Sequence, residues 1–198
     1  MSENIIVKPK DSQSVIERQL VNYCYGVLKL DKTDKGFIAG GAILSYLMRT
    51  KSDVDIFYNQ EVDADNAFAL FKELKEVKRT TKKKNAYQVA IHGHKLDLVK
   101  LPFASPIECI KQFDFAVAMV AVDRDMNFYC HKNWYEHVSA KSLVINELPF
   151  PVSTAWRVLK YIRKGFHICP TQYQKILTAV KNNTKPDDTL DGFYDAFD

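Results

Sequence analysis

The sequence contains no apolar run of the roughly 18 to 20 residues that a membrane-spanning helix requires, and its first twelve residues are polar. It has no C-x-x-C pair, because its four cysteines, Cys24, Cys109, Cys130 and Cys169, are widely separated. That spacing argues against a zinc ribbon and a disulfide scaffold. Only seven of the 198 residues are glycine, and neither a repeat nor a low-complexity tract interrupts the chain. We expect a cytoplasmic protein with reduced thiols and no membrane partner.

Charge is modest overall but unevenly distributed. The formal net charge is +4, and hydrophobic residues make up 46% of the chain, as in an ordinary folded domain. Residues 72–84 carry seven bases against two acids, whereas residues 187–198 carry five aspartates and no base. The basic segment suits polyphosphate or nucleic acid, or it is a solvated helix end and loop. The acidic segment is a frayed terminus, a segment that docks a protein partner, or a flap over the basic surface.

Hydrophobic spacing predicts a mixed α/β body followed by a helical lobe. Apolar residues at intervals of three and four predict helices, and short apolar or alternating runs predict strands. The expected helices are 12–30, 42–49, 64–78, 107–113, 154–164 and 171–182, and the expected strands are 36–40, 54–58, 86–91, 95–101, 115–122 and 127–131. Because the chain changes character after Pro149, we expect a catalytic domain over 1–148 and a helical lobe with the acidic tail over 149–198.

Three aspartates fall on two of the expected strands. Side chains alternate between the faces of a strand, so Asp53 and Asp55 point the same way, about 7 Å apart along it. If the strand that contains Asp97 lies alongside, three carboxylates surround one position. Such a group repels itself unless the carboxylate pKa values rise or cations bind, and hard oxygen ligands favour Mg²⁺. We therefore predict a site for two Mg²⁺ ions, with Mn²⁺ as a substitute.

A glycine pair precedes these aspartates. Gly40 and Gly41 stand between an expected strand and an expected helix, where glycine lets a ligand approach the backbone and exposed N–H groups bind phosphate. Ser45, Arg49 and Ser52 follow as further donors. We predict that this segment holds the phosphates of a nucleoside triphosphate.

The ordered set Gly40-Gly41, Asp53-x-Asp55 and Asp97 resembles the nucleotidyltransferase superfamily of DNA polymerase beta. It is most similar to the head domain of the CCA-adding enzymes and bacterial poly(A) polymerases. Phe113-Asp114-Phe115 resembles that family's later Arg-Asp-Phe segment, and the basic stretch that contains Arg157 and Lys160 resembles its helix ending in Gly-Phe. The chain departs from the pattern at Leu44-Ser45, where the family has Arg-Asp, and at Phe113, where arginine is usual.

The resemblance implies a nucleotidyltransferase fold with a mixed, mostly antiparallel sheet flanked by helices. It implies that Asp53 and Asp55 hold the metals and the triphosphate, that Asp97 completes the site as the base, and that Asp114, Arg157 and Lys160 bind nucleotide. The expected reaction transfers a nucleoside monophosphate from an NTP, such as ATP, to an acceptor hydroxyl, first of all an RNA 3′ end. A small molecule or a protein is the alternative acceptor, and a non-catalytic module that binds nucleotide or a partner is the alternative class.

Overall fold

The computed structural model describes residues 4–184, which form an eight-stranded sheet and seven α-helices. The strands are β1 (Ile5–Lys8), β2 (Phe37–Ala39), β3 (Val54–Phe57), β4 (Val77–Lys82), β5 (Ala86–Ile91), β6 (His94–Val99), β7 (Val120–Val122) and β8 (Phe128–His131). The helices are α1 (Val15–Leu28), α2 (Gly41–Leu47), α3 (Glu61–Glu73), α4 (Pro106–Lys111), α5 (Trp134–Ser139), α6 (Pro151–Arg163) and α7 (Pro170–Lys181). None of the helices in this part of the chain is long and apolar enough to cross a membrane.

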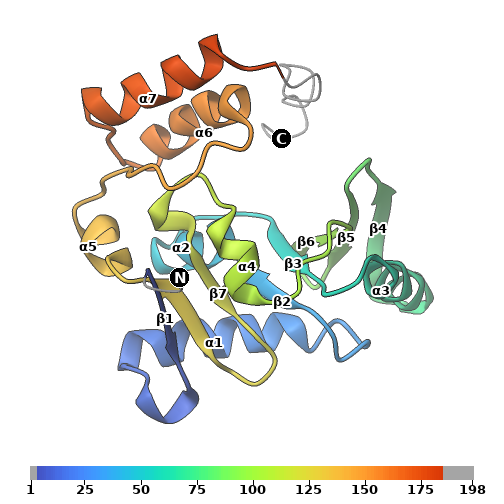
Figure 1. Ribbon diagram of the computed structural model, residues 1–198. Helices are drawn as coiled ribbons and strands as arrows, with labels where there is room; N and C mark the ends of the chain where they lie inside the picture. Colours follow the sequence, from blue (N-terminus) through green and yellow to red (C-terminus); the bar gives the residue numbers. More distant parts are fainter. Residues whose placement is uncertain (1–3, 185–198) are drawn as a thin grey trace. The chain divides into compact units, whose positions relative to one another are not determined.

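The strands lie in the order β1-β8-β7-β2-β3-β6-β5-β4 (Figure 1). β3 and β6 run parallel, and the other neighbouring strands run antiparallel. This is the mixed, mostly antiparallel sheet that the sequence predicts. The parallel pair forms because the chain leaves β3, crosses through α3 and returns by the β4–β5–β6 meander.

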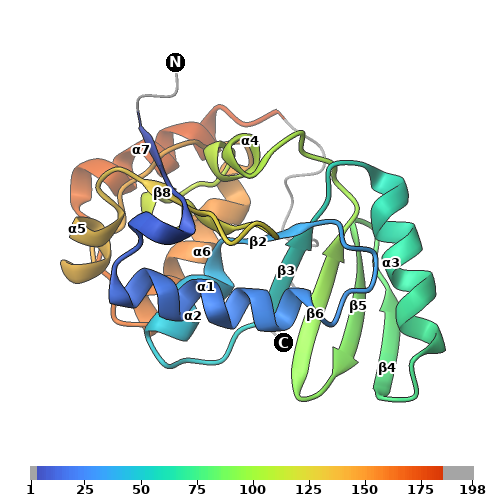
Figure 2. The same cartoon turned by 90° about the horizontal axis from the view of Figure 1, so that it is seen from below.

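Alternating residues of the central strands divide the sheet into two faces. Val54 and Ile56 of β3 and Leu96 and Leu98 of β6 are buried in the core. Helix α3 covers this face of β4, β5 and β6, as Figure 2 shows. The residues between these core positions, the aspartates among them, therefore point to the other face.

The segment after α3 differs from the expectation. The sequence predicts one helix over 64–78, but α3 ends at Glu73 and Val77 already begins β4. The charged residues continue the helical spacing, yet Val77, Thr80 and Thr81 are β-branched and pair with β5. Pairing along a sheet edge outweighs the local helical pattern here. The basic segment is thus largely an edge strand and its turn.

The expected hairpin is confirmed around a tight turn. β5 and β6 pair from Ala86 with Val99 to Ile91 with His94. The two turn residues, His92 and Gly93, have φ values of 48° and 82°. These are the left-handed conformations of a type I′ turn, which match the twist of the flanking strands. The registers of β5 and β6 follow from this turn.

The chain divides into two compact units. Within the described residues, one unit consists of residues 4–111 together with Ala118–Lys132, and it contains the whole sheet; the other consists of Gln112–Val117 and residues 133–184. In the second unit α6 packs against α7 (Figure 1). Pro151 opens α6 and Gly165, with φ at 85°, follows its end. The domain boundary at 148–149 stays a prediction, and the acidic segment 187–198 lies outside the described residues.

Candidate active site

The predicted aspartates meet where β3 and β6 run side by side. Asp55 pairs directly with Asp97 in the parallel register, and the neighbouring pairs are Val54 with Leu96 and Ile56 with Leu98. Because those neighbours point into the core, the two carboxylates project from the opposite face, on strands about 4.8 Å apart. Asp53 precedes β3 by one residue and contacts the side chain of Lys95, the residue on β6 that faces the same way as Asp97.

The carboxylates of Asp53 and Asp97 contact polar side chains of the protein itself. The Lys95 ammonium lies 2.9 Å from Asp53 Oδ2, and the side-chain amide of Gln88 donates a hydrogen bond of 2.8 Å to Asp97 Oδ1. The ammonium of Lys83 lies 3.9 Å from Asp97 Oδ2. These contacts offset the repulsion between neighbouring carboxylates. They give the site positive groups as well as negative ones.

A divalent cation fits this donor set after one rearrangement. In residues 4–184 no three Asp, Glu, His or Cys side chains stand ready to hold a metal. The side chains of Asp53 and Lys95 are 40% and 38% exposed, so their ion pair contributes at most about 1 kcal/mol and exchanges readily. When Asp53 turns from Lys95, its oxygens can join those of Asp55 and Asp97. Carboxylate oxygens are the ligands that Mg²⁺ prefers.

Helix α4 packs on the sheet beside the aspartates, close enough for the charge of Asp55 to act on its Cys109. Its Cys109 is fully buried, and burial raises the pKa of the Cys109 thiol well above its usual value, with the negative charge of Asp55 adding to the effect. Helix α4 packs against β2, β7 and β8. The Cys109 thiol on α4 therefore stays protonated and uncharged.

The glycine turn leads from β2 into α2. Gly40 has φ at 83° and ψ at −140°, a conformation that only glycine adopts freely, and its N–H donates to the Val120 carbonyl at 2.8 Å. That N–H is committed to the sheet. Gly41 begins the helix, and a Cβ added there would meet nothing within 4 Å. Of the two glycines, Gly41 is therefore the one whose backbone has space for a ligand beside it.

The other predicted phosphate donors lie within α2 and in the segment between α2 and β3. Ser45 is buried within the helix, at 1% exposed. Arg49 follows the helix end in a left-handed conformation with φ at 56° and is exposed, and Ser52 is half-buried just before β3. Their contribution to nucleotide binding stays a prediction.

The second unit brings together two further predicted residues. Arg157 Nη1 lies 2.5 Å from Asp114 Oδ2, and the Thr154 hydroxyl donates to the same oxygen at 3.2 Å. Asp114 is buried, whereas the Arg157 side chain is 44% exposed. Lys160, one helical turn further along α6, is exposed. Asp114 and Arg157 thus stabilise the unit by contacting each other.

Sequence reasoning did not identify Lys95, Gln88 and Thr154 as partners of the site residues. The position of Lys95 could have been predicted, since Lys95 and Asp97 are two residues apart on one strand and therefore lie on the same face. Gln88 and Thr154 become partners through strand register and helix packing, which a single sequence does not specify.

Comparison with solved structures shows a shared fold. The CCA-adding enzyme of Thermotoga maritima complexed with tRNA is 16% identical, with a TM-score of 0.61 over 89% of this chain and 46% of that one. A CCA-adding enzyme complexed with CTP gives 15% identity and a TM-score of 0.62 over 89% and 47%. The Bacillus stearothermophilus CCA-adding enzyme with CTP gives 17% and 0.53 over 82% and 43%.

These likenesses confirm the nucleotidyltransferase fold that the sequence predicts. The chain spans slightly less than half the length of these enzymes. No curated protein matches the sequence. The sequence model of the Gabija anti-defense 2 family matches residues 14–141, well over half of the chain and all of the strands that carry the aspartates. The chain therefore belongs to the Gabija anti-defense 2 family and has a nucleotidyltransferase fold.

Proposed function

We propose that the protein transfers a nucleoside monophosphate from an NTP to an acceptor hydroxyl and releases pyrophosphate, in a metal-dependent reaction. The observation that carries the proposal is the pairing of Asp55 with Asp97 across the parallel strands, with Asp53 at the start of β3 beside Lys95. Carboxylates placed this close on the partly exposed face of neighbouring strands suit divalent cations and, through them, phosphates. The glycine turn lies next to them, because β2 pairs with β3.

The aspartates divide the chemistry between them. Asp53 and Asp55 would hold two Mg²⁺ ions, or Mn²⁺, which neutralise the triphosphate and lower the pKa of the acceptor hydroxyl. Asp97 accepts the hydroxyl proton as the acceptor oxygen attacks the α-phosphorus. The bond from that phosphorus to the bridging oxygen breaks, and the electron pair leaves with pyrophosphate. Gln88 orients Asp97 through its hydrogen bond of 2.8 Å.

Several residues would bind the nucleotide before transfer. The backbone at Gly41 and the side chains of Arg49 and Ser52 are exposed or half-buried beside β2 and β3. Gly40 shapes the turn, and Ser45 supports it from within α2. In the second unit, Asp114 holds Arg157, whose side chain remains 44% exposed and able to meet a nucleotide together with Lys160.

The acceptor that we propose is an RNA 3′ end. The structures of similar fold include a CCA-adding enzyme complexed with tRNA and others complexed with CTP or ATP. The basic residues 72–84 run from the end of α3 through the edge strand β4 into its turn, on the side of the sheet that continues from Asp97. Nucleotidyl transfer to a small molecule or a protein would use the same aspartates. A non-catalytic module that binds nucleotide or a partner would not need them.

Transfer of label from each NTP tests both the reaction and the acceptor. The protein is incubated with α-labelled NTP, Mg²⁺ or Mn²⁺ and total RNA, and an Asp53→Asn/Asp55→Asn double variant serves as the control. We expect label in RNA that the double variant loses. Label in protein or in small molecules would support nucleotidyl transfer but show that the acceptor is not RNA. Nucleotide-induced thermal stabilisation without any transfer would favour the binding module.

Membership in the Gabija anti-defense 2 family supports a biological setting for the same chemistry. We propose that the protein counteracts the defence system named Gabija through its nucleotidyl-transfer site. Cells that carry this defence are challenged while they express the wild type or the Asp53→Asn/Asp55→Asn variant at equal levels. Suppression of defence by the wild type alone supports a catalytic mechanism. Equal suppression by both proteins would show that binding, rather than transfer, counteracts the defence.

A further inference from the structure

Strand register arranges polar residues in two rows across one face of the sheet. The first row consists of Thr81 on β4, Gln88 on β5, Asp97 on β6 and Asp55 on β3, each paired with the next. A second row runs from Arg79 through Ala90 to Lys95, which contacts Asp53. A bulge between Val77 and Arg79 sets this register on β4. The carboxylates therefore stand at one side of a continuous polar surface, which we call the β4–β5 platform.

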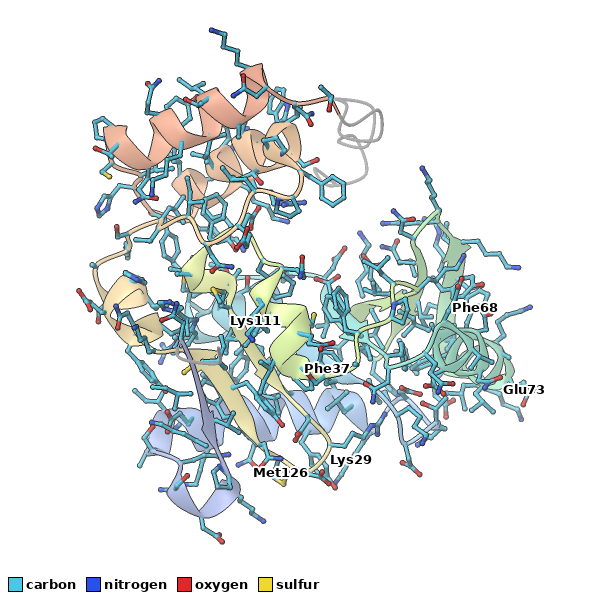
Figure 3. The ribbon with its side chains drawn as sticks, viewed as in Figure 1. Lys29, Phe37, Phe68, Glu73, Lys111 and Met126 are labelled. Carbon is cyan, nitrogen blue, oxygen red and sulfur yellow. The ribbon has the colours of Figure 1, made fainter. Side chains whose placement is uncertain are left out.

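Small side chains leave the β4–β5 platform accessible. Thr81, Ala86, Gln88 and Ala90 are all partly exposed. Helix α3, which carries Phe68 (Figure 3), packs on the opposite face, where Phe68 stacks on Tyr87 with ring centroids 4.2 Å apart. Helix α4 lies over β2, β7 and β8, away from these strands. Side chains this short allow an extended ligand to lie close to the strands.

Two basic residues, one on the edge strand and one in the turn that follows it, contribute positive charge to the platform. Arg79 is exposed on β4, and Lys83 follows the strand and turns toward Asp97, 3.9 Å from its Oδ2. They are four residues apart, about 13 Å along an extended chain. Lys82 and Lys84 flank Lys83 at the turn. The platform thus combines positive charge at the sheet edge with the proposed base two strands away.

We propose that the β4–β5 platform binds the phosphodiester backbone of a single-stranded nucleic acid and leads its end toward Asp97. Arg79 and Lys83, whose backbones lie about 13 Å apart along the chain, are too widely spaced to bind the phosphates of one nucleotide together, but they suit separate, non-adjacent phosphates of a longer single strand. The platform residues include neither tryptophan, tyrosine nor phenylalanine, so binding depends on phosphate charge and shows little sequence preference. That the bound nucleic acid serves as the acceptor rests on the proposed function, whereas its binding to the platform does not.

Strand binding is measured without metal or NTP, so that it is independent of catalysis. A fluorescein-labelled mixed-sequence RNA of about 12 nucleotides, and the same sequence as DNA, are titrated in EDTA at about 50 to 200 mM KCl, with anisotropy as the readout. The test variant is Arg79→Gln/Lys83→Gln. The matched control is Lys72→Gln/Lys75→Gln, which removes the same charge from the exposed end of α3 and the loop that follows it. Circular dichroism verifies that both variants fold.

The salt dependence decides the outcome. Each phosphate contact with a single strand contributes about 0.7 to the slope of log K against log salt, so the test variant should bind more weakly with a slope shallower by about 1.4. Arg79→Lys/Lys83→Gln, which keeps one of the two cations, should recover about half of that loss, and the control should match the wild type. Equal losses in both double variants, or none in either, would overturn the platform. Such a result leaves the proposed function untouched, because that function is tested separately by transfer of label from NTP and by its loss in the aspartate variants.

Discussion

Replacing Lys95 with methionine should tighten metal binding at the aspartate site. The Lys95 ammonium contacts Asp53 at 2.9 Å, so an incoming cation must displace it and then bind near its charge. Methionine keeps the unbranched shape of the side chain as far as the ε position and removes the charged ammonium. The substitution therefore removes the competition between the ammonium and the metal for Asp53 and largely preserves the packing of the side chain.

The magnitude follows from the exposure of the pair. Breaking an ion pair whose side chains are 38% and 40% exposed costs about 0.2 to 1 kcal/mol. Repulsion between the ammonium and a divalent cation about 4 Å away adds about 1 to 2 kcal/mol at the dielectric of water, and part of it is relieved as the side chain swings away. A net effect of about 1 to 2 kcal/mol corresponds to a roughly 5- to 30-fold lower Kd for Mn²⁺.

Titration of Mn²⁺ monitored by electron paramagnetic resonance measures this Kd directly. Lys100→Met is the matched control, because Lys100 follows the same strand but lies over the Tyr87 ring on the opposite face. We expect it to leave the Kd within about twofold. Equal tightening in both variants would reveal a general charge effect. Weaker Mn²⁺ binding in Lys95→Met would refute the competition between Lys95 and the metal.

Three further predictions test the framework around the site. Arg157→Gln should lower the free energy of unfolding in urea by about 1 to 3 kcal/mol, because it removes the charged partner of buried Asp114; unchanged stability would show that their contact is not structural. Gly40→Ala should lower stability by about 1 to 3 kcal/mol through strain at positive φ, whereas Gly41→Ala should leave the melting temperature unchanged and weaken nucleotide binding. Only Cys169 among the four thiols is exposed, so Ellman's reagent should titrate one thiol in the folded protein and four in denaturant; a fast second thiol would contradict the packing.

The sequence predicted the central strands and the first helix because local signals agree with tertiary packing there. Ser14 and Glu17 form a reciprocal capping box at the start of α1, and the apolar stripe of that helix is buried as its spacing indicates. The turn at His92-Gly93 likewise specifies its hairpin. In these elements short-range chemistry and the final fold require the same conformation.

Sequence reasoning failed where long-range pairing decides the structure. The spacing over 64–78 indicates a helix, yet Val77 pairs with Ile91 on β5 and the chain becomes a strand. β1 was also missed, because Ile5–Lys8 is a short edge strand whose register with β8 has no local signal. At the site, the alternation of Asp53 and Asp55 predicted their shared face, but the polar partners of Asp97 follow from register alone.

The most direct test of the account is pyrophosphate release by the wild type compared with Asp55→Asn. Asp34→Asn makes the same carboxylate-to-amide change at a side chain that is 96% exposed and remote from the β3–β6 pair, so it serves as the control. With NTP, Mg²⁺ and RNA, we expect the wild type and Asp34→Asn to release pyrophosphate, and the rate of release to fall by about 100-fold or more in Asp55→Asn. Equal release by all three proteins would contradict the assignment of nucleotidyl transfer to the paired aspartates.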